Sequence, residues 1–186
     1  MKTIKIVSGL AAIALLAACG DSVRTPEEDH EHESITTVEL KFVNKASASD
    51  SFTLKYLDAD GIGGAAPTLP SLGRLKTGAT YDASVRFLDQ SNPSDVHDLS
   101  EEIGGAESDD HRIFWITGSR LTATIADKDS KGLLLGLKAT VAPLSAGTDT
   151  LHINLRHLPG IKTANSTITD GETDAEVAFP FEIAVP

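Results

Sequence analysis

The chain has 186 residues, of which 40% are hydrophobic, with a formal net charge of −11 and a single cysteine. This length suits one ordinary domain with a sizeable core. The acidic balance argues against nucleic acid as a partner, and one cysteine leaves no intramolecular disulfide.

The first 18 residues have the layout of a secretory signal peptide. Two lysines within residues 2–5 precede a largely apolar stretch over residues 7–18, which is shorter than the roughly 20 residues that span a bilayer. The run Leu16-Ala17-Ala18-Cys19 looks like a bacterial lipobox, in which the cysteine is acylated and becomes the new N-terminus. An ordinary signal peptide with a coincidental cysteine is the alternative. Gly20 follows where an aspartate often signals inner-membrane retention, so we expect a lipid bilayer anchor at Cys19 in the outer membrane.

Residues 19–34 are expected to form an acidic, disordered tether. Loss of the two signal-peptide lysines lowers the formal charge from −11 to −13, and the tether has almost no apolar side chains. His30 and His32 lie among its carboxylates. Imidazole suits zinc, copper, nickel or iron, so these histidines are candidate metal ligands. A solvated acidic linker is the alternative.

Residues 35–186 alternate apolar and polar side chains with a period of two, which is typical of half-buried strands. The pattern predicts about eight strands, near residues 37–42, 52–56, 81–87, 113–117, 121–125, 137–141, 151–155 and 177–185. One short helix is expected over residues 94–103, with Ser94 as N-cap. Pro180, inside the last strand, predicts an edge position or a bulge. The fold class is therefore all-β: a single antiparallel β-sandwich of immunoglobulin-like architecture with one short helix.

Polar side chains gather just before the strand at 113–117. In a helix over residues 94–103, His97 and Glu101 would be four apart and share a face, where they could chelate a metal ion or form an ordinary helix pair. His111 directly precedes the next strand, which places it at the rim of the sandwich. An ordinary charged loop is the alternative.

A second histidine has the parity needed to face the same rim. His157 follows the inward-facing positions of the strand at 151–155, so it could share a metal ion with His111, supported by Glu102 or Asp174. A core-edge histidine with its hydrogen bonds satisfied is the more common role. Arg156 has outward parity and could pair with the acidic loop or bind an anion.

Asp58 and Asp60, closed by Gly61, resemble a fragment of a calcium loop, and Asp127 with Asp129 a weaker one. Neither stretch supplies the full ligand set of an EF-hand, and Asp-Gly turns between strands explain them as well. The sequence contains no nucleophile elbow, phosphate loop or His-Glu-x-x-His helix, and acylation of Cys19 leaves no free thiol. We therefore expect a protein that is not an enzyme.

Five segments in chain order carry a family resemblance: Ile35-Thr-Thr-Val-Glu-Leu, Asp58-Ala-Asp-Gly, Leu99-Ser-Glu-Glu-Ile, Leu155-Arg-His-Leu-Pro and Gly171-Glu-Thr-Asp-Ala-Glu-Val. Over nearly all of residues 35–185 the chain resembles small Bacteroidetes-type lipoproteins labelled as a type 1 periplasmic-binding-fold superfamily. That label implies ligand binding. Members of this group are encoded near outer-membrane TonB-dependent receptors, which implies a surface accessory protein for nutrient or metal capture. The matching polar positions are Glu102, His111, Arg156, His157, Glu172 and Asp174.

The fold that this label implies has alternating helices and parallel strands. The sequence pattern shows neither, so we still expect the β-sandwich. The function expected is a membrane-anchored, non-enzymatic protein that captures a divalent metal ion, zinc or copper first and calcium second, for an outer-membrane receptor. A structural or interaction module without a small ligand, docking through loops or an edge strand, is the competing class. A calcium-stabilised adhesion-like domain that uses Asp58 and Asp60 is the third.

Overall fold

The computed structural model describes residues 34–60 and 64–186, and every helix and strand named below lies in the compact unit Glu33–Pro186. Cys19, His30 and His32 lie outside the described residues, as do the expected signal peptide and nearly all of the expected tether. Predictions about them therefore stay predictions. Within the described part of the chain, no helix is long and apolar enough to cross a membrane.

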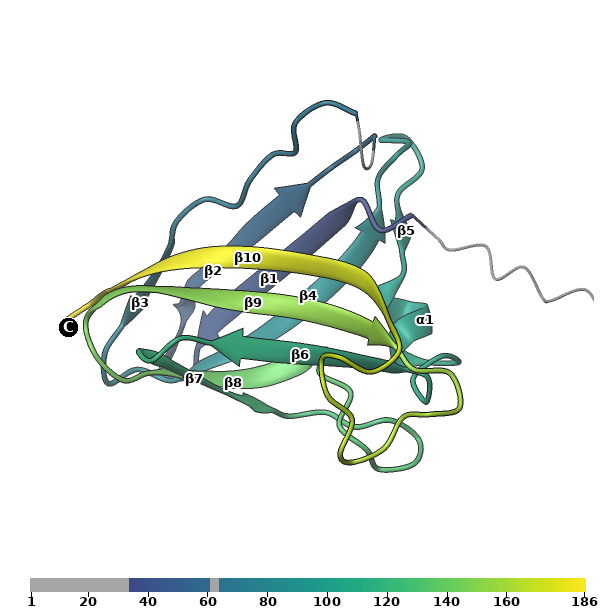
Figure 1. Ribbon diagram of the computed structural model, residues 1–186. Helices are drawn as coiled ribbons and strands as arrows, with labels where there is room; N and C mark the ends of the chain where they lie inside the picture. The colour runs from purple at the N-terminus through teal and green to yellow at the C-terminus, as the bar shows by residue number, and fades with distance from the viewer. Residues whose placement is uncertain (1–33, 61–63) are drawn as a thin grey trace, which may run out of the picture. The chain divides into compact units, whose positions relative to one another are not determined.

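The strands form two sheets that pack face to face as a β-sandwich (Figure 1). The larger sheet has the order β2-β1-β4-β8-β7, with β5 paired to β4, and the smaller has the order β3-β10-β9-β6. The strands of the larger sheet are β1 (Thr37–Asn44), β2 (Ser47–Leu57), β4 (Tyr81–Asp89), β5 (His97–Asp98), β7 (Leu121–Ile125) and β8 (Lys138–Pro143). Those of the smaller sheet are β3 (Gly73–Lys76), β6 (His111–Thr117), β9 (Gly147–His157) and β10 (Glu172–Ala184). The helix α1 spans Ser100–Gly104.

The core lies between the inward faces of both sheets, where every second residue of a strand is apolar. Phe42 of β1 and Phe181 of β10 meet across it, with ring centroids 5.3 Å apart in an edge-to-face arrangement. Full burial of one such side chain contributes about 1.5–3 kcal/mol. The predicted all-β sandwich with one short helix is confirmed. Among the strand pairs in the described residues, β3 with β10 departs from antiparallel order by pairing in parallel.

The predicted helix over residues 94–103 is wrong in its first half. β5 (His97–Asp98) pairs with β4, and α1 begins only at Ser100. Asp98 holds this arrangement, because its carboxylate accepts hydrogen bonds from the Arg86 guanidinium (2.8 Å) and from the N–H of Ser100 (3.1 Å). Pairing with a neighbouring strand therefore overrides the local helical signal.

Pro180 has an edge on one side only. On the β3 side, β10 is paired from Phe181 to Ala184, so Pro180 lies just before that pairing begins. β10 is an inner strand of its sheet, so the predicted edge position at Pro180 holds only locally, on the β3 side. The irregularity in the β10 ladder lies elsewhere, between Thr173 and Ala175, next to the residues considered below.

Candidate metal centre

Three strand ends of the smaller sheet meet at one end of the sandwich. β6 begins at His111, β9 ends at His157, and β10 begins two residues before Asp174 (Figure 1). His111 and His157 are direct cross-strand partners. They have the parity of the buried Ile113 and Leu155, so both imidazoles belong to the core-facing side of the sheet. The two histidines are therefore neighbours at the rim, as a shared site would require.

The ring geometry is compact. The imidazole rings of His111 and His157 stack with centroids 4.7 Å apart and an interplanar angle of 13°. Nε2 of His111 lies 3.5 Å from Oδ2 of Asp174. One ligand atom from each of the three residues can be chosen so that all lie within 4.8 Å of one another. We call these three residues, His111, His157 and Asp174, the rim cluster.

The backbone sets the tautomer of His111. Nδ1 of this ring lies 3.1 Å from the carbonyl oxygen of Glu107, so Nδ1–H donates to that carbonyl. The lone pair is then on Nε2, the atom that faces Asp174. A hydrogen bond of this kind, from the second ring nitrogen to a carbonyl, is what commonly orients a metal-binding histidine. Glu107 stands four residues before His111, and the sequence analysis assigned it no role.

The rim cluster attracts positive charge. The side chains of His111 and Asp174 are 9% and 16% exposed, and Oδ2 of Asp174 is buried without a hydrogen bond of regular geometry. Burial alone lowers the pKa of His111, but the Asp174 carboxylate and the Glu107 carbonyl outweigh it, so the pKa is raised above its usual value. A proton or a metal cation at Nε2 would offset the buried carboxylate.

The other predicted ligands in the described residues do not join the rim cluster. His97 Nε2 lies 3.6 Å from Glu102 Oε1, away from the cluster, and Glu101 is exposed in α1. His97 belongs to β5, so the predicted sharing of a helix face with Glu101 is wrong. Glu172 is exposed opposite His157 in the strand register.

The predicted calcium loop is only partly described. Asp60 accepts a hydrogen bond from the N–H of Ala65 (2.7 Å), and Oδ1 of Asp58 is buried without a hydrogen-bond partner. Residues 61–63 between these groups are not described, so calcium at Asp58 and Asp60 stays a prediction.

Asp129, in the weaker candidate loop, has a different partner. Its Oδ2 lies 2.7 Å from the Lys162 ammonium, and the two side chains are 0% and 2% exposed. Oδ1 of Asp129 accepts hydrogen bonds from the N–H groups of Lys131 and Leu133. Sequence spacing carries no signal for a pair so far apart in the chain, and the sequence analysis missed Lys162.

Arg156 has the predicted outward parity, but it is buried, and its hydrogen-bond partners are two backbone carbonyls and a hydroxyl rather than an acidic loop or an anion. Nε donates to the carbonyl oxygen of Asp170 (2.9 Å) and Nη2 to that of Gly171 (2.6 Å). Nη1 donates to the hydroxyl of Thr173. All three guanidinium nitrogens are thus used by the start of β10 and the loop before it.

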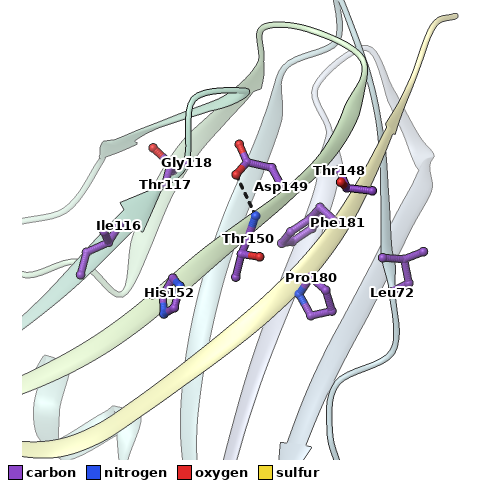
Figure 2. Close-up of a pocket in the computed structure, with 10 residues that line it drawn as sticks. All are labelled: Leu72, Ile116, Thr117, Gly118, Thr148, Asp149, Thr150, His152, Pro180 and Phe181. Atoms are coloured by element: carbon purple, nitrogen blue, oxygen red, sulfur yellow. Dashed lines mark hydrogen bonds between the residues drawn. The ribbon is translucent and has the colours of Figure 1, made fainter.

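The outer face of the smaller sheet bears a shallow pocket of about 570 Å³ (Figure 2). Ile116, His152 and Pro180 line it, with the opposite parity to the core residues of their strands. Its one carboxylate, Asp149, is bound by backbone, because it accepts hydrogen bonds from the N–H groups of Arg120 and Thr150, both at 2.8 Å. The pocket therefore offers apolar surface, hydroxyl groups and the His152 imidazole rather than an unpaired carboxylate.

Comparison with protein-family models, with curated proteins and with solved structures found no match to this chain. Any assignment of function therefore depends on the geometry of the rim cluster and on the sequence itself.

Proposed function

We propose that this protein is a lipid-anchored, non-enzymatic lipoprotein of the outer membrane that captures a divalent transition-metal ion, zinc or copper, at the rim cluster. The anchor is Cys19, and the ion is passed to an outer-membrane uptake receptor. The sequence supports the anchor, and the family resemblance supports the receptor. The observation that supports a metal ion is that Oδ2 of Asp174 lies buried, without a hydrogen bond, beside two imidazoles.

The spacing of the ligand atoms supports an ion rather than a direct hydrogen bond. A charge-assisted N–H···O bond is about 2.7–2.9 Å long. Two ligand atoms on one tetrahedral zinc ion lie about 3.3 Å apart, as bonds of about 2.0–2.1 Å require. The 3.5 Å between His111 Nε2 and Asp174 Oδ2 is closer to the second value.

His157 must adjust to complete the set. Because its ring stacks on that of His111, the lone pairs of the two rings do not converge on one point in the present arrangement. Rotation of the half-buried His157 ring about its side-chain bonds brings one of its nitrogens toward the ion. Two imidazoles and one carboxylate then bind a zinc ion and leave a fourth position for water or an exchanging ligand.

Calorimetric titration of residues 20–186 with Zn²⁺, Cu²⁺ and Ca²⁺ tests the proposal. Zinc affinity should fall by at least about 100-fold in His111→Ala and Asp174→Asn, since loss of an outer-shell group alone costs about 10–100-fold. The matched control is His152→Ala, because His152 belongs to the same strand as His157 but to its opposite face. Affinity should also survive deletion of residues 20–32, which separates the rim cluster from His30 and His32.

Binding no tighter than millimolar for all three ions would refute the proposal. The competing function, an interaction module without a small ligand, then takes its place. The observation that favours this alternative is the open pocket of Figure 2, where Leu72 and Ile116 are exposed.

A further inference from the structure

We infer that Arg156 and Thr173 form a clamp that sets the β-bulge at Asp174 and so turns the Asp174 carboxylate toward the two imidazoles of the rim cluster. Arg156 is thus a positioning residue for the metal site. The consequence for metal affinity rests on the proposed function, whereas the placement of the carboxylate does not.

The strand register shows why a bulge is needed. Thr173 pairs with Arg156 and Ala175 pairs with Leu155, so Asp174 is an extra residue without a partner in β9. In an unbroken ladder, Asp174 would lie opposite Arg156, on the outer face of the sheet. One inserted residue reverses the parity and re-aims the side chain, as bulges do near binding sites.

Arg156 fixes this irregular stretch from the outer face. Its guanidinium donates to the carbonyl oxygens of Asp170 and Gly171 and to the hydroxyl of Thr173. These three acceptors bracket the turn into β10, directly before Asp174. Arg156 is only 7% exposed, so these hydrogen bonds lie where water competes poorly.

Gly171 makes the close approach of the two strands possible. Its φ is +63°, and a Cβ at this position would collide with the carbonyl oxygen of His157. The start of β10 is therefore pressed against the last residue of β9, which is itself a member of the rim cluster. Backbone geometry and the Arg156 hydrogen bonds thus act on the same few residues.

A matched control exists on the same face. Arg112 is the cross-strand partner of Arg156 and also holds the β9–β10 loop, by donating to the carbonyl oxygen of Ser166 (2.9 Å). No hydrogen bond of Arg112 in the described residues reaches the bulge. Arg112→Lys therefore loosens the loop without releasing Asp174.

The test uses Thr173→Val, which removes the hydroxyl but keeps the branched shape, with Thr173→Ser as the conservative rescue. In metal-free chain 20–186, which retains the whole unit Glu33–Pro186, nuclear Overhauser contacts report whether the Asp174 β-protons lie near the His111 ring. These contacts should weaken in Thr173→Val and Arg156→Lys and persist in Thr173→Ser and Arg112→Lys. Zinc affinity should fall about tenfold in the first two variants and stay within about twofold in the others.

Unchanged contacts and unchanged zinc affinity in Thr173→Val would overturn the clamp. An equal loss in Arg112→Lys would also overturn it, because the effect would then be one of general loop stability. If the wild-type chain binds neither zinc nor copper more tightly than millimolar, the proposed function fails, and the metal-free contacts alone decide where Asp174 is held.

Discussion

Replacement of Lys162 by methionine should be among the most destabilising single changes away from the rim cluster. Its ammonium lies 2.7 Å from Asp129 Oδ2 and donates a 2.7 Å hydrogen bond to the carbonyl oxygen of Ser108. Both charged side chains are at most 2% exposed, so Lys162→Met leaves a buried carboxylate without its counter-charge. Breaking such a pair on one side costs about 3–5 kcal/mol.

That cost is large against a total stability of about 5–15 kcal/mol. For a domain of this size, 1 kcal/mol shifts Tm by about 2–4 °C, so we expect Tm to fall by roughly 6–20 °C. Urea unfolding of chain 20–186, followed by the fluorescence of Trp115, measures the loss directly. The surface control is Lys131→Met: its ammonium lies 3.4 Å from Asp109, but the lysine side chain is 63% exposed, so we expect a loss of at most about 1 kcal/mol.

The double variant Lys162→Met/Asp129→Asn distinguishes a charge effect from a packing effect. Asparagine keeps an oxygen for the N–H groups of Lys131 and Leu133 but carries no charge. Most of the loss should therefore be recovered. A single variant that costs less than about 1 kcal/mol, or a double variant as unstable as the single one, would refute the reasoning.

Two further predictions concern the rim. Since the pKa of His111 is raised in the folded protein, the stability that its proton brings is complete below pH about 6.5 and is lost as pH rises through the raised pKa. Urea midpoints of the wild type should therefore decline over that range more than those of Asp174→Asn, and equal slopes would contradict the assignment. Gly171→Ala should cost about 1–3 kcal/mol, because it adds a collision with the His157 carbonyl to an unfavourable φ. Gly160→Ala, with a similar φ of +66° and open space around its Cβ position, should cost clearly less in the same unfolding assay.

Most of what could be predicted about the rim cluster came from the alternation of inward and outward residues along the strands. The alternation of Leu151, Ile153 and Leu155 places His157 on the inner side, and the structure places it there opposite His111. Parity fails at Asp174. Counted back from Val177, this residue is assigned to the outer face, and only the extra residue in the ladder brings it inward. A one-residue bulge leaves the composition of a strand unchanged, so alternation alone cannot reveal it.

Very short strands, and ion pairs between residues far apart in the chain, could not be predicted from the sequence for a related reason. β5 has two residues and β3 has four, which is too few for a period to be recognised. Their existence depends on the free edges of β4 and β10, which are tertiary features. The same holds for the pair of Lys162 and Asp129, because burial turns two ordinary loop residues into an ion pair that connects three loops.

In the proposed metal site, a proton and a metal ion would compete for one lone pair at the rim. Nδ1 of His111 is occupied by its bond to the Glu107 carbonyl, so Nε2 alone can take either occupant. Below the raised pKa the proton offsets the charge of the Asp174 carboxylate, and above it Oδ2 of that carboxylate stays buried without a hydrogen bond. An ion that binds only the folded protein adds about 2.7 kcal/mol at 100 times its Kd, and it does so in the pH range where the proton no longer contributes. In the proposed site, the proton would therefore occupy Nε2 of His111 below its raised pKa, and a metal ion would bind there most readily above it.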